Sequence, residues 1–196
     1  MYKRKDQILF LIMMLIVGVS IASGGCIGGG PESSTKTYDV TSEAPSGTMT
    51  EGDIGKPVRA TVKDYKGTRI VEVTVLDYIR GEKANRMIND TNRFNDKPKA
   101  GYEYLLVKVR VRYIKGAEEL RMSPLYFKAF SRNVGTKYSW IVMPEETPKF
   151  ESTGMTQGGE VEGWMAFEVA QNEEVQLKYY PNLVGDPVIS IRIPSS

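Results

Sequence analysis

The stretch LLVKVRVR, residues 105–112, decides the fold. Apolar side chains occupy every second position here, and Lys108, Arg110 and Arg112 stand between them. Because successive side chains of a β-strand point to opposite faces, this alternation gives the strand one apolar face and one charged face. The stretch therefore predicts a strand that is buried on one side only.

The same alternation recurs along the chain after residue 53. It predicts eight strands, at residues 58–63, 71–75, 105–112, 125–131, 137–142, 161–169, 175–180 and 188–193. Turn-forming residues occur between strands at 65–67, 133–135 and 185–187. No segment after the N-terminal leader shows a helical repeat of ten or more residues. Short, half-buried strands with regular turns are typical of an all-β sandwich or barrel, which we expect to span residues 54–196.

Residues 79–99 interrupt this rhythm. The segment is too polar for a core strand, so we expect an exposed insertion between the second and third strands. Asn89, Asp90 and Thr91 form an N-glycosylation sequon, which makes Asn89 a candidate glycosylation site outside the cell. The oxygen-rich residues 89–96 lack the spacing of a calcium-binding EF-hand loop, so we expect a solvated loop and no metal site.

The N-terminus has the layout of a secretory signal peptide. A short basic segment, residues 2–6, precedes fifteen uncharged and mostly apolar residues, 8–22, and small residues follow. We expect the signal peptide to span residues 1–25. The alternative is an uncleaved transmembrane anchor, because no charge occurs between Asp6 and Glu32. In both interpretations the basic residues stay inside and the remainder of the chain faces outward.

Cys26 is the only cysteine of the 196 residues. SGGC, residues 23–26, resembles the lipobox of prokaryotic lipoproteins, and CIGG, residues 26–29, is similar to lipoproteins of archaea in particular. The resemblance implies that Cys26 carries a lipid that anchors the chain to the outer face of the cell membrane. A lone cysteine cannot form an internal disulfide. Residues 26–53 are rich in Ser, Thr, Gly and Pro, so we expect a flexible linker.

Charge and composition exclude several classes of function. The chain has 26 basic and 24 acidic residues, and without the four charged residues at positions 3–6 there are 23 of each. A neutral domain gives no support for nucleic-acid binding. The chain has no histidine, which excludes Ser-His-Asp catalysis and histidine-ligated metal sites. We expect neither a cofactor nor catalytic residues.

Two sets of residues are candidate contact surfaces. Lys108, Arg110 and Arg112 form a positive row suited to an anionic polymer or lipid headgroups. The alternative is an ordinary wet face whose charges pair with nearby glutamates. Trp140 and Trp164 are candidates for stacking on a sugar or peptide. Trp164 is out of phase with the inward-facing residues of its own strand, so the alternative for it is to cover the second face of the sheet beneath a loop.

Three stretches carry a family resemblance: residues 101–109, residues 125–130 before a glycine turn, and residues 157–169. In this order they resemble the immunoglobulin-like domain of unknown function that occurs in many bacterial and archaeal lipoproteins. The resemblance covers roughly residues 71–193 and implies an immunoglobulin-like antiparallel β-sandwich of about eight strands. It implies no established activity and no catalytic residues.

These features together predict a lipid-anchored, extracytoplasmic interaction module rather than an enzyme. We expect its loops to bind or scaffold an envelope protein or polysaccharide, while Cys26 holds membrane lipid. One alternative is a lipoprotein that binds a small ligand or ion and works with a transporter. Another is an envelope hydrolase that uses a pair of carboxylates.

Overall fold

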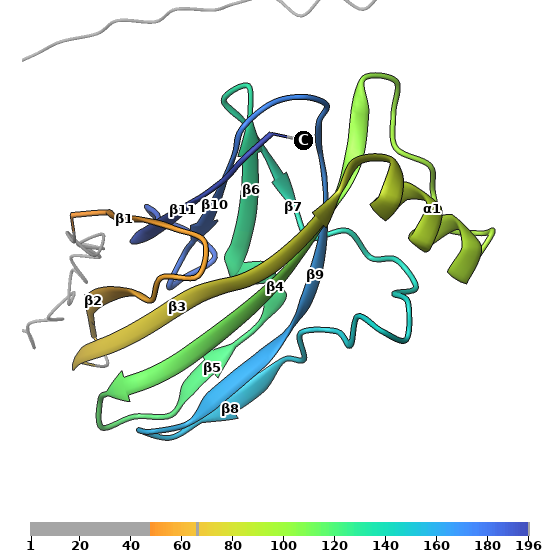
Figure 1. The fold of residues 1–196 in the computed structure, drawn as a ribbon. Coiled ribbons are helices and arrows are strands. Elements are labelled where there is room, and N and C mark those ends of the chain that lie inside the picture. The colour runs from red at the N-terminus through yellow and green to blue at the C-terminus, as the bar shows by residue number, and fades with distance from the viewer. Residues whose placement is uncertain (1–47, 66, 196) are drawn as a thin grey trace, which may run out of the picture. The chain divides into compact units, whose positions relative to one another are not determined.

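The computed structural model describes residues 48–65 and 67–195, and these residues form an all-β domain with a single α-helix (Figure 1). A five-stranded sheet has the order β1 (Thr50–Asp53), β11 (Ile189–Ile193), β10 (Val175–Tyr179), β6 (Phe127–Ser131) and β7 (Val134–Lys137). A four-stranded sheet has the order β2 (Val58–Asp64), β3 (Gly67–Arg80), β4 (Tyr102–Lys115) and β9 (Glu160–Ala170). A short third sheet joins β5 (Leu120–Met122) to β8 (Thr153–Met155).

The two larger sheets pack face to face. One hydrophobic cluster contains buried side chains from both, among them Val107 and Val109 of β4, Leu177 of β10 and Ile191 of β11. Neighbouring strands in the named sheets are antiparallel, except that β1 runs parallel to β11. The predicted antiparallel β-sandwich is therefore confirmed.

β4 lies at the centre of this arrangement, but it is not buried on one side only as its alternation predicted, because Leu106 on the outer face is also fully buried. Leu105, Val107, Val109 and Val111 are fully buried in the core between the sheets. Each such side chain contributes about 1.5–3 kcal/mol relative to an exposed one. β4 pairs with β3 on one side and with β9 on the other, so its backbone hydrogen bonds are satisfied on both edges.

Only residues 92–99 of the segment 79–99 form the largely exposed loop that we expected. β3 continues to Arg80, and α1 (Gly81–Thr91) follows it directly. Ala84 and Ile88, four residues apart on one face of the helix, pack against the outer side of the four-stranded sheet, on a second cluster that includes Leu106. The apolar helical pattern in the sequence is weak because only two side chains of α1 are needed to pack the helix on the sheet. The sheet supplies the rest of the apolar surface.

Two expected strands also differ from the structure. Residues 138–142 form an irregular segment instead of a strand, although Tyr138 and Ile141 are buried as in a strand. The Ser139 amide of this segment donates to the Ala166 carbonyl of β9 at 2.8 Å. The strand expected at 125–131 begins only at Phe127, after a short 3₁₀ helix, Pro124–Tyr126.

The N-terminal predictions fall mostly outside the described residues. The signal peptide, Cys26 and the linker up to residue 47 lie there. The last linker residues, 50–53, form β1, so the ordered domain begins before the expected boundary at residue 54. Among the residues that the structure describes, no helix has the length and apolar character needed to cross a membrane.

The buried guanidinium of Arg80 connects the two sheets at one end. Arg80 of β3 donates from Nε to Oε1 of Glu103 on β4 at 2.6 Å, and the two side chains are 3% and 6% exposed. The same guanidinium donates from Nη1 to the carbonyl oxygens of Glu173 at 3.0 Å and Pro194 at 2.6 Å. Glu173 precedes β10 and Pro194 follows β11, so one side chain on the four-stranded sheet holds two segments of the other sheet.

Candidate functional site

The positive row predicted on residues 108–112 lies on the outer face of β4, where carboxylates neutralise it. Lys108 Nζ lies 2.6 Å from Glu162 Oε1, and Arg110 Nη2 lies 2.7 Å from Glu162 Oε2. Arg112 Nη1 lies 3.3 Å from Glu72 Oε1. Hydrogen bonds from Lys108 and then Arg110 lower the pKa of Glu162, and the bond to Glu162 raises the pKa of Arg110. The row therefore has the arrangement of the alternative interpretation, a wet face with glutamate partners.

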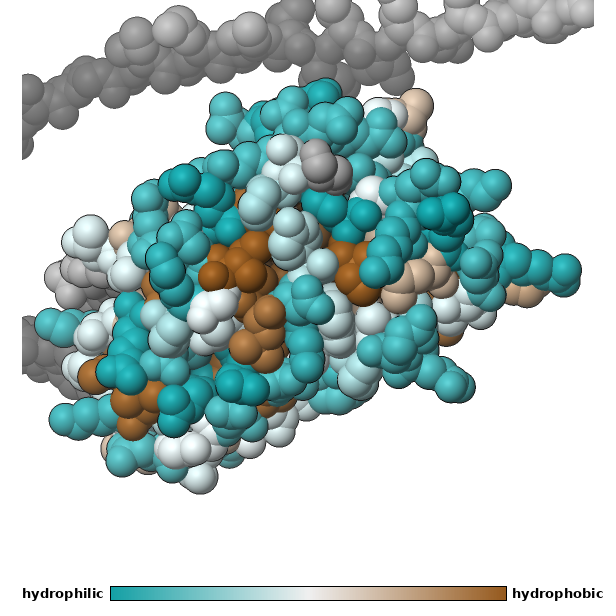
Figure 2. Space-filling view, in the orientation of Figure 1, coloured by the Kyte–Doolittle hydropathy of each residue, from teal (hydrophilic) through white to brown (hydrophobic). Residues whose placement is uncertain are grey.

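The two tryptophans lie in different environments. Trp164 is 6% exposed and packs in the second cluster with Leu106 and Ile88, so it covers the second face of the sheet and offers little contact surface. Trp140 is 77% exposed and meets the Tyr138 ring edge-on, with ring centroids 5.0 Å apart. Figure 2 shows one face of the molecule, on which hydrophilic side chains cover most of the surface and hydrophobic residues form small groups.

A pocket of about 430 Å³ lies between α1 and residues 95–104. Ile88 and Tyr104 line it and are both almost fully buried. The Tyr104 hydroxyl donates to the Asp96 carbonyl at 2.7 Å, and the Tyr104 amide donates to Asn85 Oδ1 at 2.8 Å. Burial raises the pKa of Tyr104, and the charges of Glu168 and Asp96 raise it further, so the hydroxyl keeps its proton at neutral pH.

Asn95 holds the wall of the pocket in place. Its Nδ2 donates to the carbonyls of Ile88 at 3.0 Å and Val142 at 2.9 Å, and its Oδ1 accepts from the Val142 amide at 2.9 Å. One side chain thus ties the end of α1 to the irregular segment that follows β7. The pocket is therefore braced by hydrogen bonds from two segments distant in sequence.

The rim of the pocket is polar and carries both signs of charge. It includes Asn89, which is exposed on α1 and is therefore a helix residue rather than a loop residue. Gln171 donates from Nε2 to the Tyr102 carbonyl at 3.1 Å, which leaves its carbonyl oxygen facing no protein donor among the described residues. The charged members of the rim are Arg86, Asp96, Lys97 and Lys99.

This arrangement suits non-covalent binding of a small polar molecule with an apolar part, because an apolar floor and a few polar groups are typical of ligand pockets. In residues 48–65 and 67–195 no group of three or more His, Cys, Asp or Glu side chains could hold a metal ion. Sequence reasoning missed Asn85, Asn95, Tyr104 and Gln171. The spacing of Ala84 and Ile88 is the one signal that could have indicated a helix here, and with it the pocket.

Comparison with known proteins assigns the family. The family described as a domain of unknown function, DUF4352, matches residues 62–189. The chain belongs to this family. The expected resemblance to a domain of unknown function is thus confirmed, whereas the archaeal type of signal peptide stays a prediction. No curated protein matches this DUF4352 chain.

Two solved structures share the fold of this DUF4352 chain. One is the secreted protein MPT63 of Mycobacterium tuberculosis, at 14% identity and a TM-score of 0.52, with 74% of this chain and 98% of that protein covered. The other is ycdA of Bacillus subtilis, a candidate lipoprotein, at 17% identity and a TM-score of 0.50. That match covers 64% of this chain but only 36% of the Bacillus protein. At these identities the likeness concerns the fold alone.

Proposed function

We propose that this DUF4352 chain is a lipid-anchored, extracytoplasmic binding module and that the pocket beside α1 is its ligand site. The observation that carries the proposal is the pocket itself, in which Ile88 and Tyr104 form an apolar floor beneath amide and charged side chains. The leader and Cys26 support the location. The two similar folds are described as a candidate lipoprotein and a secreted protein, which agrees with this location.

The module acts by binding, without catalysis. Support comes from the amino-acid content, because the chain has no histidine and its one cysteine precedes the domain. The ligand is a small molecule, or the end of a larger envelope component, that presents both hydrogen-bonding groups and an apolar face. Asn89 and Gln171 on the rim supply hydrogen bonds, while the Tyr104 ring and Ile88 supply apolar contact.

Mass spectrometry of the chain recovered from cells tests the anchor. The expected product lacks residues 1–25, carries a lipid on Cys26 and is found in the membrane fraction. Cys26→Ser removes the lipid and leaves the domain intact. A cytosolic product that keeps Met1 and an unmodified Cys26 contradicts the location, whereas an intact, membrane-bound chain supports the signal-anchor alternative.

A pair of variants on α1 tests the pocket. Asn89→Arg places a large side chain at the rim, whereas Thr91→Arg adds the same charge to the same helix at a position that does not line the pocket. Both changes destroy the sequon, so neither variant can be glycosylated at Asn89 and the two can be compared directly. The full-length variants are incubated with envelope extract, and bound molecules are identified by mass spectrometry. The site is supported if Thr91→Arg retains a bound molecule that Asn89→Arg loses. It is contradicted if both variants retain that molecule equally, or if neither variant binds any molecule.

A further inference from the structure

Three lysines form one row across the five-stranded sheet. Lys137 of β7 lies opposite Lys128 of β6, and Lys128 lies opposite Lys178 of β10. Residues directly opposite each other on antiparallel strands share a face of the sheet. Since Ala129 and Leu177, the next residues along two of these strands, face the core, the lysine row lies on the outer face. Adjacent strands are about 4.8 Å apart, so the row spans about 10 Å.

The lysine row has no carboxylate partners in the part of the chain that the structure describes. None of its three ammonium groups lies within 4.0 Å of an acidic oxygen there. The row on β4 is different, because each of its cations has a glutamate. Like charges directly opposite each other destabilise a sheet, so folding alone gives no reason for the row.

Flanking carboxylates do not neutralise the lysine row. Glu173 pairs with Arg132 at 2.9 Å, and Glu174 lies 3.7 Å from Arg192. Asp186 lies near Tyr180, whose ring is in contact with Lys128. Burial raises the pKa of the Tyr180 hydroxyl, and the charge of Asp186 raises it further. Glu51 of β1 is a second carboxylate nearby, because it lies opposite Ser190, which lies opposite Lys178. Two carboxylates near three cations still leave a net positive surface.

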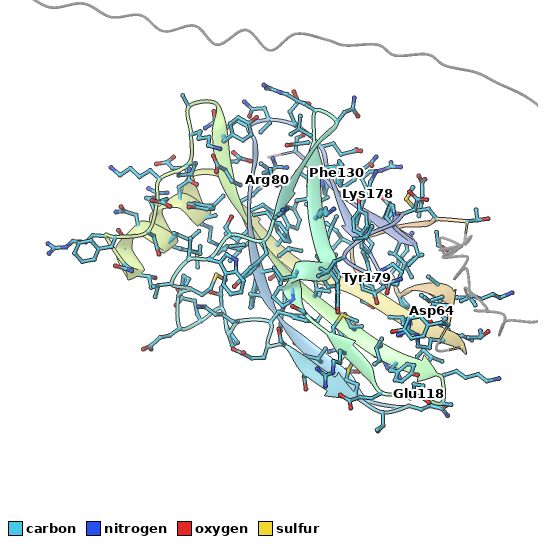
Figure 3. All side chains as sticks on the ribbon, turned by 180° about the vertical axis from the view of Figure 1, so that it is seen from behind. Asp64, Arg80, Glu118, Phe130, Lys178 and Tyr179 are labelled. Atoms are coloured by element: carbon cyan, nitrogen blue, oxygen red, sulfur yellow. The ribbon has the colours of Figure 1, made fainter. Side chains whose placement is uncertain are left out.

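Aromatic rings hold two of the lysines in place. Lys178 Nζ lies 4.5 Å from the centroid of the Phe130 ring, and the two residues lie next to each other in Figure 3. Lys128 Nζ lies 4.3 Å from the centroid of the Tyr180 ring. A cation is attracted to the face of an aromatic ring, which restricts the long side chain while the ammonium stays charged. Less conformational freedom is then lost when an anion binds.

Gly135 of β7 allows the Phe130 ring to take its position. The two residues are directly opposite each other, and a Cβ at position 135 would lie 2.6 Å from Phe130 Cζ. Any side chain at 135 would displace the ring that carries Lys178. The glycine therefore supports the arrangement of the lysine row.

We propose that the lysine row binds a linear acidic polysaccharide of the cell envelope. A straight row on an open sheet suits a polymer with repeated anionic groups better than a small molecule, which needs a concave site. On the side of Lys178 the row leads to a small polar hollow lined by Glu51, Gly52, Gln176, Ser190 and Arg192. Its polar side chains can bond to sugar hydroxyls, and the Glu51 carboxylate marks the end of the surface that an acidic chain can follow. Lys128 and Lys178 are half-buried and lie on rings, whereas contact with a bilayer favours extended lysines that reach the headgroups.

Binding of the full-length protein in detergent to immobilised polygalacturonate tests this inference. It rests on the proposed extracytoplasmic location but not on the pocket, so Asn89→Arg should bind polygalacturonate like the unmodified chain. Lys128→Gln/Lys178→Gln removes two charges and keeps the side-chain length. We expect it to weaken binding at least tenfold. The control Lys63→Gln/Lys83→Gln removes two exposed lysines elsewhere and should change binding less than twofold.

A third variant separates charge from placement. Phe130→Leu keeps all three lysines but removes the ring beneath Lys178, so we expect binding to weaken two- to fivefold at unchanged net charge. Binding should also fall as salt is raised, because screening weakens attraction between exposed charges. Equal weakening by both double variants, equal binding of neutral dextran, or tighter binding to vesicles of anionic phospholipid than to polygalacturonate would each overturn the proposal.

Discussion

Replacing Arg80 by methionine tests whether the ion pair between β3 and β4 holds the sandwich together. Methionine has a similar length and packs well, but it cannot compensate the carboxylate of Glu103. Removing one partner of a buried ion pair typically costs about 3–5 kcal/mol, because the remaining charge is left without its counter-charge. Arg80 also donates to the carbonyls of Glu173 and Pro194, and each lost bond costs about 1 kcal/mol. We therefore expect a loss near the upper end of that range.

Such a loss is large for a domain of this size, because total stability is typically about 5–15 kcal/mol. Urea unfolding followed by tryptophan fluorescence measures it, since Trp164 is buried and becomes exposed on unfolding. Glu103→Gln should cost less, about 1.5–3 kcal/mol, because Arg80 keeps its carbonyl acceptors at Ala170, Glu173 and Pro194. The double variant Arg80→Met/Glu103→Leu should be more stable than Arg80→Met alone, because neither charge remains buried.

Arg192→Met is the matched control. Arg192 lies 3.7 Å from Glu174 on the surface of the five-stranded sheet, with both side chains more than half exposed. Solvent screens such a pair, so the expected change is at most about 1 kcal/mol. If Arg80→Met costs no more than this control, or if the double variant is as unstable as Arg80→Met, then the reasoning from a buried, mutually dependent pair is wrong.

Three further changes have outcomes that follow from single contacts. Ile88→Ala removes the apolar contact of α1 with the sheet and should cost about 2–4 kcal/mol in urea unfolding, with faster amide exchange in α1 than in β4. Gly163→Ala places a Cβ 2.6 Å from the Lys149 carbonyl oxygen, so it should cost about 1–3 kcal/mol, whereas full stability would show that this backbone moves freely. Because the pKa of Glu162 is lowered in the folded state, its contribution to folding stability is present above the usual glutamate pKa and is lost as the pH falls through the lowered value. In Glu162→Gln, unfolding midpoints measured over a pH series should therefore depend less on acid pH than in the unmodified chain.

The fold class followed from short-range patterns. The alternation in residues 105–112 and in seven other segments predicted strands, and in seven of these eight segments most or all residues lie in a strand of the structure. A turn was also indicated at 133–135, but the structure places it at Arg132 and Asn133, which both have positive φ as a tight hairpin requires, while residues 134 and 135 belong to β7. α1 was missed because its apolar face consists of little more than Ala84 and Ile88. Residues 138–142 were wrongly predicted as a strand because their apolar residues are buried in an irregular segment.

The candidate sites depended on contacts that no local pattern shows. By itself the sequence determined that Lys108, Arg110 and Arg112 share one face, because residues two apart on a strand must do so. Only the tertiary structure decided that Glu72, Glu160 and Glu162 neutralise them. It likewise decided that Lys128, Lys137 and Lys178, up to 50 positions apart, form a row without such partners. The reason is that strand pairing sets which charges meet, and pairing depends on how the whole chain closes its core.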